Sequence, residues 1–303
     1  MPVSHDFATS PVESAWQQAT ETPERTLVVG AGGQLGRALQ GLWLGRDDVD
    51  FLEREVLDIG AHASIEAFDF SPYSVIVNAA GYTDKDGAES AEGRREAWAV
   101  NAQGVALLVS AAREAGAVLV HVSSDYVFDG SEAFHTEEEG FAPLGVYGQT
   151  KAAGDAAVST LAAHYILRTS WVVGEGKNFV ATMREHARNG ESPSVVNDQF
   201  GRLTFTEEIA RAIDFVLREH APFGTYNVSN SGDPASWFDI AQKVFELTGH
   251  DPTMVQSVSS AEYLDAHKGI ALRPINSALD LSKITEAGFR PREQFEALAA
   301  YLA

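Results

Sequence analysis

Short apolar runs alternate with longer stretches of helical periodicity over the first half of the chain. The apolar runs are bounded by turn residues and predict buried strands at residues 26–29, 50–52, 75–77, 118–122 and 165–167. The stretches between them predict helices at residues 34–44, 95–115 and 147–161. Strands that alternate with helices form a parallel sheet covered on both faces, so we predict an α/β fold built on a doubly wound parallel Rossmann sheet.

The same pattern divides most of the chain into two lobes. Residues 26–172 are predicted to form a dinucleotide-binding Rossmann core, to which a segment at about residues 196–230 returns. The last third mixes short apolar runs with loops and a helical stretch at residues 237–247. We therefore predict a smaller mixed C-terminal substrate-binding lobe, made of residues 173–195 and 231–303, that packs over the mouth of the sheet.

Residues 1–25 do not fit this pattern, because they are polar and lack clear periodicity. We interpret them as an N-terminal extension, a linker or the remnant of a fusion, with one short helix near residues 12–19. They show no basic start followed by an apolar segment, so we expect no signal peptide. No apolar run in the chain reaches the roughly 18 residues that span a bilayer, so we expect a cytoplasmic protein without a membrane partner.

The 303-residue chain has no cysteine, and this excludes disulfides, thiol catalysis and cysteine metal sites. Its nine histidines show no HExxH pairing, so we expect no catalytic metal. A net charge of −21 without a basic footprint argues against DNA or RNA as a partner. The same charge means that a phosphorylated ligand depends on backbone N–H groups and a few Arg or Lys side chains.

A glycine-rich turn follows the first predicted strand and precedes the first predicted helix. Gly30, Gly33 and Gly36 have a GxxGxxG spacing, with Gln34 and Leu35 between the last two. Glycines there allow a tight turn, a close approach of the backbone to a pyrophosphate and close helix–strand packing. The helix N-terminus adds N–H groups and the positive end of a dipole. The turn therefore predicts a dinucleotide site, and a glycine-rich turn without a ligand is the alternative.

Glu53 lies 23 residues after Gly30, at the end of the second predicted strand. A carboxylate at that place accepts hydrogen bonds from the adenosine ribose and favours NADH, whereas the following Arg54 would pair with the 2′-phosphate of NADPH. An ordinary exposed charge pair is the alternative for both residues. The sequence therefore predicts NADPH or NADH as the cofactor and leaves the choice open.

Tyr147 and Lys151 are four residues apart on a predicted helix, so their side chains share one face. Reduction of a ketone needs a proton donor beside the hydride donor, and a free tyrosine, with a pKa of about 10, is a poor one at neutral pH. A nearby ammonium favours the phenolate and lowers that pKa. Because the same lysine can hydrogen-bond the nicotinamide ribose, both residues are candidates for catalysis and for cofactor binding.

Ser123 and Ser124 stand where the predicted strand at residues 118–122 ends. The carboxyl ends of strands form the ligand-binding edge of such a sheet, so the Ser124 hydroxyl is placed to bind a substrate carbonyl and to complete a Ser-Tyr-Lys set. The alternative for Ser124 is a strand-end cap. Asp125 fits a supporting role in catalysis and a turn or capping role equally well.

Longer blocks of the sequence resemble the dTDP-4-dehydrorhamnose reductases, which are extended short-chain dehydrogenase/reductases. The run SSDYVFDG at 123–130, followed by PLGVYGQTKAAGD at 143–155, carries the resemblance most clearly. Further blocks agree in order along residues 27–295: NAAGYT at 78–83 with Asp86 and Glu89, VNA at 100–102, LRTSWV at 167–172, DQxGxxT at 198–204, and RPxNSxLD at 273–280.

The resemblance implies hydride transfer from NAD(P)H to C4 of a dTDP-4-keto-6-deoxyhexose, which yields dTDP-L-rhamnose. It implies that Tyr147 donates the proton, that Lys151 tunes its pKa and that Ser124 polarises the carbonyl. The further cofactor contacts that it implies are Asp58, Ile59, Asn78, Ala79, Ala80, Tyr82 and Ser123. The implied substrate contacts are Ser124, Asp125, Tyr126, Val127, Phe128, Trp171, Asn178, Gln199, Arg202 and Arg273.

Three of these matches carry a more specific expectation. Trp171 would lie against the sugar, with a core aromatic at a strand end as the alternative. Arg202 would offset diphosphate charge at the nucleotide end. Asn101 resembles a structural asparagine of the family, and we assign it no catalytic role.

The chain also departs from the family pattern at a few positions. Ser124 stands where the family usually has threonine, and serine keeps the hydroxyl. Lys85 replaces a valine and Gly87 a variable residue of the block that begins at Asn78. Val173 and Leu203 replace a tyrosine and a proline near the expected sugar or nucleotide region. The exact sugar is therefore less firmly predicted than the reaction type.

Two other functions remain as alternatives. Nucleotide-sugar dehydratases and epimerases share the scaffold, but dehydratases carry a glutamate where this chain has Tyr126. A non-catalytic regulatory subunit of methionine adenosyltransferase also resembles the family, whereas this chain keeps Ser124, Tyr147 and Lys151. Besides the nucleotide-sugar substrate, the sequence leaves a homodimer and a fused or associated 3,5-epimerase open as partners.

Overall fold

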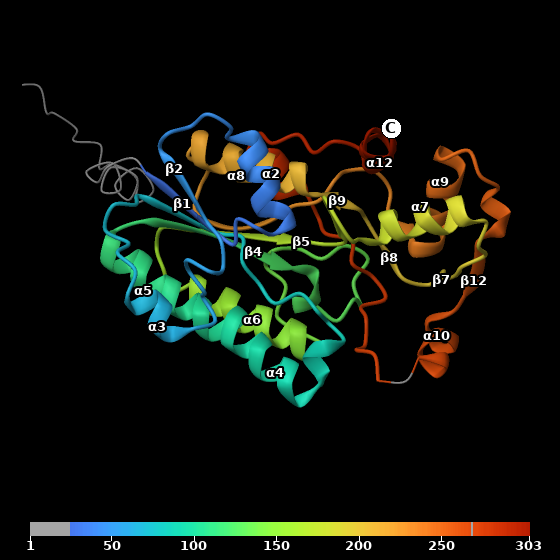
Figure 1. Ribbon diagram of the computed structural model, residues 1–303, viewed down its shortest axis with the longest axis horizontal. Helices are drawn as coiled ribbons and strands as arrows, with labels where there is room; N and C mark the ends of the chain where they lie inside the picture. The colour runs from blue at the N-terminus through green and yellow to red at the C-terminus, as the bar shows by residue number, and fades with distance from the viewer. Residues whose placement is uncertain (1–24, 268) are drawn as a thin grey trace, which may run out of the picture.

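Six parallel strands form the central sheet of the protein, and they run through the middle of the molecule (Figure 1). The computed structural model describes residues 25–303 except residue 268, so the helix expected near residues 12–19 lies outside the described residues. The strand order is β2-β1-β3-β4-β5-β10. The strands are β1 (Thr26–Val29), β2 (Val49–Leu52), β3 (Val75–Asn78), β4 (Val118–Ser124), β5 (His164–Thr169) and β10 (Gly224–Asn227).

This sheet confirms the predicted doubly wound parallel fold. The chain adds β2 on one side of β1 and then returns to add β3 on the other side. A crevice for a ligand forms at such a switch point, outside the carboxyl ends of the two strands. The β1–β3 pair, in which Val29 lies opposite Asn78, therefore marks where a ligand is expected.

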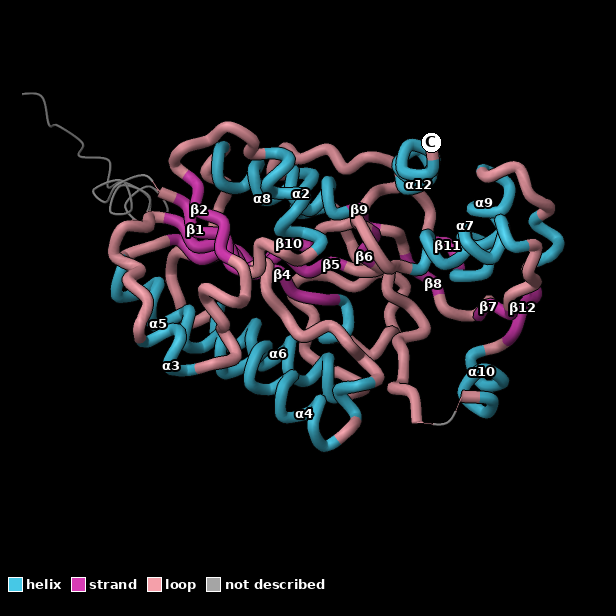
Figure 2. The backbone as a smooth tube through the Cα atoms, viewed as in Figure 1, coloured by secondary structure: helices cyan, strands magenta, loops and turns pink. Residues whose placement is uncertain are grey.

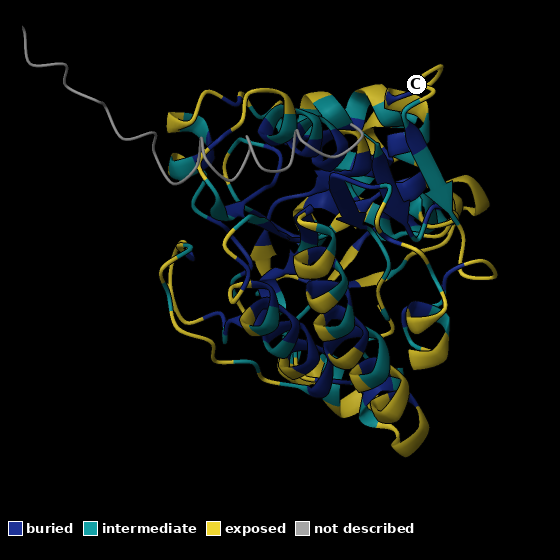
Figure 3. Cartoon of the chain, turned by 90° about the vertical axis from the view of Figure 1, so that its left-hand side faces the viewer, coloured by how far each residue is buried: buried dark blue, intermediate teal, exposed yellow. Residues whose placement is uncertain are grey.

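Helices cover both faces of the sheet, whose strands are largely buried (Figure 3). Successive side chains of a strand point to opposite faces. In β1, Val28 joins the core on one face, whereas Leu27 and Val29 join the core on the other. The first layer contains α2 (Gln34–Leu42), α8 (Thr206–Arg218) and α11 (Ser282–Glu286). The second contains α3 (His62–Glu66), α5 (Val105–Ala115) and α6 (Val146–Val158), with α4 (Ala91–Trp98) and the 3-10 helix η1 (Gly87–Glu89) beside α6.

The helix expected at residues 95–115 is interrupted in the structure. The stretch η2 (Ala99–Gly104), between α4 and α5, is π-helical. Within η2 the Asn101 amide nitrogen donates to the Tyr82 carbonyl at 3.0 Å and to the Thr150 hydroxyl at 3.1 Å, and the Asn101 amide oxygen accepts from the Tyr82 N–H at 2.9 Å. Single π-turns are rare and often occur at functional sites. Here Asn101 joins the loop after β3 to α6.

The rest of the chain forms a smaller lobe beyond the end of the sheet (Figure 2). Its hydrophobic core is separate and joins Leu203 and Phe205 to Val180, Ile240 and Phe245. Its helices are α7 (Phe179–Asn189), α9 (Trp237–Leu247), the 3-10 helix η4 (Pro252–Met254), α10 (Ser260–Ala266) and α12 (Gln294–Leu302). Its strand pairs are β6–β9 (Val172–Val173 and Thr204–Phe205), β8–β11 (Phe200–Gly201 and Ala235–Ser236) and β7–β12 (Ser194–Val196 and Gln256–Val258).

None of the helices in residues 25–267 and 269–303 is long and apolar enough to cross a membrane.

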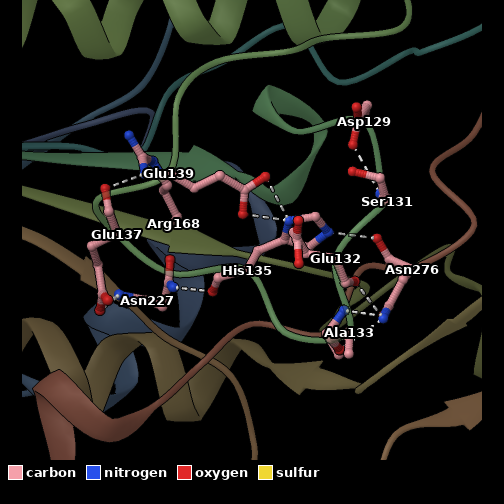
Figure 4. A network of polar contacts seen from close by, with 11 residues as sticks. Asp129, Ser131, Glu132, Ala133, His135, Glu137, Glu139, Arg168, Asn227 and Asn276 are labelled. Atoms are coloured by element: carbon pink, nitrogen blue, oxygen red, sulfur yellow. Dashed lines mark hydrogen bonds and ion pairs between the residues drawn. The ribbon is translucent and has the colours of Figure 1, made fainter.

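A buried histidine fixes the loop that leaves the end of β4 (Figure 4). One imidazole nitrogen of His135 contacts the Glu139 carboxylate at 2.8 Å, and the other lies 3.1 Å from the Asn276 carbonyl oxygen. The ring also stacks on Phe128, with 4.7 Å between centroids. The Asn227 side-chain amide of β10 donates to the His135 carbonyl at 2.8 Å. These contacts hold the segment after η3 (Asp125–Val127) against both β10 and the C-terminal part of the chain.

Two glycines inside helices have opposite surroundings and offer a matched test of how closely α6 is packed. A Cβ at Gly154 would lie 2.4 Å from the Asn101 carbonyl oxygen, whereas a Cβ at Gly41 in α2 would have no atom within 4 Å. We expect Gly154→Ala to lower the free energy of unfolding by about 1–3 kcal/mol, because α6 must move away from η2. Gly41→Ala should raise it by about 0.5–1 kcal/mol, because alanine loses less backbone entropy on folding. Urea unfolding measures both, and equal stabilities would contradict the packing.

Candidate active site

A cavity of about 660 Å³ opens at the carboxyl edge of the sheet, between the two lobes. One wall comes from the ends of β1, β3 and β4 and from α6, with Gly33, Ala79, Ser124 and Tyr147 among its residues. The smaller lobe supplies the opposite wall: Trp171, Lys177, Asn178, Phe179 and Trp237. The cavity therefore lies at the switch point of the strand order, where a parallel sheet binds its ligands.

The glycine turn at the start of α2 has the shape of a pyrophosphate cradle. Gly30 has a φ of +84°, and a Cβ there would lie 2.6 Å from the Ala80 nitrogen. A Cβ at Gly36 would lie 2.4 Å from the Ala31 carbonyl oxygen, so the helix can approach the turn only with glycine there. Gly33 caps α2 without a side-chain hydrogen bond, which leaves the N–H groups of the first turn for a ligand. The chain thus fits the phosphates of a dinucleotide.

Gln34 and Leu35, which follow Gly33, both line the cavity. The Gln34 side-chain amide donates to the Lys177 carbonyl at 3.1 Å. Arg37, one helical turn along α2, pairs with Glu175 at 2.9 Å and also donates to the Gly32 carbonyl. These contacts tie the cofactor turn to the smaller lobe.

The residues expected at the adenosine end lie at the end of β2 and just beyond it. Glu53 is exposed, and its carboxyl group is 3.5 Å from the position that a Cβ at Gly32 would take. Arg54 is also exposed and pairs with Asp58 at 3.1 Å. Ile59 is buried in the core between the sheet and α5. Glu53 therefore lies beside the phosphate turn, while the Arg54 guanidinium is held by Asp58.

The residues after β3 shape the floor of the cavity. Ala79, Ala80 and Tyr82 line it, whereas Asn78 is buried below. The Asn78 amide oxygen accepts from the Ala80 N–H at 3.1 Å, and its amide nitrogen lies 3.1 Å from Nδ1 of His121. Asn78 therefore holds the loop in place and makes no direct contact with the cavity.

β4 carries both serines, because its pairing with β5 continues to Ser124 opposite Thr169. The expected strand was shorter, since serines do not continue the apolar run. The Ser124 hydroxyl donates to the Asp125 carboxylate at 2.9 Å and accepts from the Tyr126 N–H at 3.2 Å. Burial raises the pKa of Asp125, and hydrogen bonds from Ser277 and Ser124 lower it. Asp125 thus orients the Ser124 hydroxyl, and Ser123 lines the cavity beside it.

Tyr147 and Lys151 lie on the buried face of α6 and both line the cavity. Burial raises the pKa of the Tyr147 hydroxyl, and a hydrogen bond with the Ser124 side chain lowers it. The Lys151 ammonium donates to the Val122 carbonyl at 2.7 Å. Burial lowers the pKa of Lys151 to about 8, against the opposing effect of Asp155. The structure thus brings Ser124, Tyr147 and Lys151 together.

A buried ion pair lies next to Lys151 in the interior of the protein. Asp155, one turn further along α6, contacts the Arg168 guanidinium of β5 at 3.0 Å, and both side chains are almost fully buried. Burial raises the pKa of Asp155, and Arg168 lowers it. A paired carboxylate below Lys151 makes the charged ammonium more stable in this dry environment.

Two stacked tryptophans form the outer wall. The Trp171 and Trp237 rings are 3.7 Å apart with an angle of 15° between their planes. Trp171 has a φ of +44°, which is uncommon for a residue with a side chain. Gly201 allows this placement, because a Cβ there would lie 2.7 Å from the indole. Thr169 also lines the cavity, and its buried hydroxyl has no hydrogen-bond partner among the described residues.

Several residues expected to contact the substrate have other partners. Val127 and Phe128 are fully buried in a small cluster with Leu279, because η3 turns them away from the cavity. The polar ones bond elsewhere: Gln199 to the Ser260 hydroxyl at 3.0 Å, Arg202 to the Gly232 and Leu279 carbonyls at 2.6 and 2.9 Å, and Arg273 to Asp86 at 2.8 Å. Asn178 does line the cavity, but it also caps α7.

The cavity wall also contains residues that the sequence did not point to, among them Arg37, Lys85, Lys177, Phe179 and Trp237. Lys85 could have been found because it departs from the motif block, and Arg37 because it directly follows the glycine turn. The other three come from loops and helix starts of the smaller lobe, where no local pattern indicates which side chains face the sheet.

Comparison with known proteins identifies a family. The family model of the RmlD substrate binding domain matches residues 24–303. The chain belongs to this family. A dTDP-4-dehydrorhamnose reductase of Aggregatibacter actinomycetemcomitans is 38% identical over 297 residues, which cover 90% of this chain and 97% of that protein. A dTDP-4-keto-6-deoxy-D-glucose reductase of Streptomyces niveus is 37% identical over 274 residues, which cover 88% and 92%.

Solved structures are also similar to this chain. The dTDP-4-dehydrorhamnose reductase of Bacillus anthracis, in complex with NADP, has a TM-score of 0.84 and 31% identity. The match covers 93% of this chain and 99% of that chain. These comparisons confirm the family resemblance that the motif blocks predicted.

The position of Glu53 generates a prediction about cofactor choice. A carboxylate beside the phosphate turn accepts hydrogen bonds from the ribose and repels a 2′-phosphate. We expect Glu53→Gln to tighten NADPH binding relative to NADH by about tenfold, which corresponds to ~1.4 kcal/mol. Titration of both cofactors, followed by nicotinamide fluorescence, measures the ratio of dissociation constants. Glu55→Gln, which removes another exposed acid nearby, is the control and should leave this ratio unchanged.

Proposed function

We propose that this chain reduces dTDP-4-dehydro-L-rhamnose to dTDP-L-rhamnose, with NADPH or NADH as the hydride donor, in nucleotide-sugar biosynthesis. The observation that carries the proposal is the Ser124, Tyr147 and Lys151 set, which faces one cavity beside a glycine cradle. Membership of the RmlD family and relatives named as reductases of dTDP-linked keto-sugars support it. The Bacillus anthracis relative bound to NADP supports the cofactor.

The proposed chemistry at the carbonyl uses two hydroxyl groups. When bound, the reduced nicotinamide supplies the hydride that adds to C4 of the sugar. When the sugar binds, the Ser124 hydroxyl turns its single proton from the Asp125 carboxylate to the C4 oxygen and polarises the carbonyl. The Tyr147 hydroxyl gives its proton to the same oxygen. Proton transfer of this kind contributes about 10²–10⁴-fold to an enzymatic rate.

Lys151 compensates the charge that this transfer leaves on Tyr147. A phenolate in a buried site is costly unless a cation stabilises it. Lys151 is on the same helix face, and its hydrogen bond to Val122 holds the ammonium at the end of β4. Asp155 keeps the ammonium charged from the other side. The Lys151 ammonium therefore lowers the cost of the phenolate that forms when Tyr147 gives its proton to the substrate oxygen.

Dehydration is disfavoured as the reaction. A dehydratase needs a base to remove a carbon-bound proton, and the position after Ser124 and Asp125 carries Tyr126. Burial raises the pKa of Tyr126, so its phenolate, the form that could act as a base, is not populated at neutral pH. Reduction of an isomeric keto-sugar is the second candidate, because the Streptomyces niveus relative is named as a dTDP-4-keto-6-deoxy-D-glucose reductase.

The first test measures turnover. Purified protein mixed with dTDP-4-keto-L-rhamnose should oxidise NADPH or NADH, seen as loss of absorbance of the reduced nicotinamide, and the product should be dTDP-L-rhamnose. dTDP-4-keto-6-deoxy-D-glucose, tested alongside, distinguishes the second candidate. No oxidation with either cofactor and the rhamnose precursor would rule out the proposed reaction.

The second test concerns the proton donor. Tyr147→Phe should lower kcat by about 10²–10⁴-fold, since it removes only the hydroxyl, and should leave the dissociation constant of NADPH nearly unchanged. Tyr226→Phe is the control. Tyr226 lies on β10, outside the cavity, and its hydroxyl donates to the Pro222 carbonyl at 2.7 Å. A Tyr147→Phe enzyme with normal kcat would show that the proton comes from another group.

The pKa of Lys151 predicts the pH dependence. Because lysine is charged only below its pKa, kcat/KM should fall as the pH rises through about 8. Burial places the pKa of Tyr147 above its usual value, so the tyrosine stays protonated in that range. Lys151→Arg keeps a charge at all these pH values. Its profile, measured at saturating cofactor, should lose the fall near pH 8, and an unchanged fall would assign it to another group.

A further inference from the structure

Lys85 lies in the cavity and has no role in the proposed chemistry. It belongs to the loop between β3 and η1 and lines the cavity together with Ser124, Tyr126 and Tyr147. Valine occupies this position in the motif block that the chain otherwise resembles. Lys85 places an ammonium group beside the proposed carbonyl site.

The position of the ammonium is defined by two aromatic rings. The Lys85 Nζ lies 5.5 Å from the centroid of the Tyr147 ring and 5.7 Å from that of the Tyr126 ring. The two rings meet edge to face, with 5.4 Å between their centroids. A cation at this distance is attracted to the ring faces. Lys85 is therefore held beside the proposed proton donor.

The N–H donors of the Lys85 ammonium group have no hydrogen-bond partner among the described residues. Among residues 25–303 other than 268, no hydrogen bond or ion pair reaches the Lys85 Nζ. Each neighbouring carboxylate has another partner: Asp86 pairs with Arg273 at 2.8 Å, Asp125 accepts from Ser124 at 2.9 Å, and Asp84 accepts from the Gly87 N–H at 2.9 Å. Burial lowers the pKa of Lys85, while Asp125, Asp86 and Asp84 act in the opposite direction and Arg273 adds to the lowering. Three N–H donors are thus left for a ligand.

The other cations of the cavity wall are already engaged or lie elsewhere. The Lys151 ammonium donates to the Val122 carbonyl at 2.7 Å, and Arg37 pairs with Glu175 at 2.9 Å beside the glycine turn. Lys177 is exposed, and its carbonyl accepts from Gln34 next to the same turn. Arg37 and Lys177 therefore lie at the cofactor end, whereas Lys85 lies at the end that holds Ser124 and Tyr147.

We propose that Lys85 binds the sugar of the substrate, by donating a hydrogen bond from its ammonium group to a sugar oxygen next to the reacting carbonyl. This inference rests on the proposed function, because it assumes that the carbonyl is placed at Ser124 and Tyr147. The hydrogen bond is assisted by charge, and such bonds are stronger than neutral ones. Lys85 thus selects for a hydroxylated sugar at a position where valine offers only an apolar contact.

The test compares two ligands that differ only in the sugar. Isothermal titration with dTDP-L-rhamnose and with dTDP gives the gain in affinity that the sugar supplies. Lys85→Met keeps the length and apolar stem of the side chain. It should weaken the binding of dTDP-L-rhamnose by about tenfold and leave the affinity for dTDP unchanged. Lys85→Arg should retain most of the gain. Unchanged dTDP affinity in Lys85→Met also shows that the variant is folded.

Lys283→Met is the matched control. Its ammonium lies 5.6 Å from the Tyr226 ring and 3.2 Å from Glu138, outside the cavity, so the same kind of contact is removed without loss of sugar binding. In turnover assays Lys85→Met should raise KM for the keto-sugar nucleotide by about tenfold and change kcat and its pH profile little.

Two outcomes separate this inference from the proposed function. Equal affinities of the wild type and Lys85→Met for dTDP-L-rhamnose, in a wild type that turns over the keto-sugar, would overturn the role of Lys85 and leave the function intact. A wild type without turnover, in which Lys85→Met still loses the affinity gain of the sugar, would overturn the reaction and leave the sugar contact of Lys85 intact.

Discussion

The hydrogen bond from the Lys151 ammonium to the Val122 carbonyl joins the helix of Tyr147, the proposed proton donor, to the strand of Ser124. α6 brings Tyr147, β4 brings Ser124, and the two groups act on one atom only if helix and strand keep a fixed distance. Gly154 lets α6 lie close to Asn101, and Asn101 in turn holds the loop after β3. The proposed chemistry therefore depends on packing below the cavity as much as on the residues that face it.

The charged groups under this helix form a stack with alternating sign. Lys151 is followed by Asp155, and Asp155 is paired with Arg168, all within the buried interior. Removing one partner of such a buried pair is strongly destabilising, because the other charge is left uncompensated. His121 lies next to this stack, and burial and then Lys151 lower its pKa, so it adds no further positive charge. With two cations and one carboxylate, the stack carries one net positive charge inside a chain whose net charge is −21.

The sequence predicted a structural feature correctly where a local pattern of residues has a single structural explanation. Apolar runs such as residues 75–77 and 118–122 predicted strands, because burial on both faces of a parallel sheet requires them. The glycine turn and the Tyr147–Lys151 spacing pointed to groups that the structure places around one cavity. β10, with the sequence GTYN, has no such run and was expected only as a returning segment. The π-helical stretch η2 keeps a helical pattern and could not be distinguished from a regular helix.

The site was predicted less completely on the substrate side. Arg202 and Arg273 have the charge to bind phosphates, but a sequence does not show that backbone carbonyls hold Arg202 and that Asp86 holds Arg273. Trp237 could not be found, because its contact with Trp171 joins residues 66 positions apart.

That pair of tryptophans also gives the molecule an optical signal. Trp171 follows the last residues of β5 and Trp237 begins α9, and both rings pack against the hydrophobic core of the smaller lobe. Two indoles with 3.7 Å between their rings couple their electronic transitions, and the sign and strength of that coupling follow their mutual orientation. A change in how α9 packs against Trp171 therefore changes the mutual orientation of the two rings. The far-ultraviolet circular dichroism of the protein therefore reports how the two indoles of the outer cavity wall are packed.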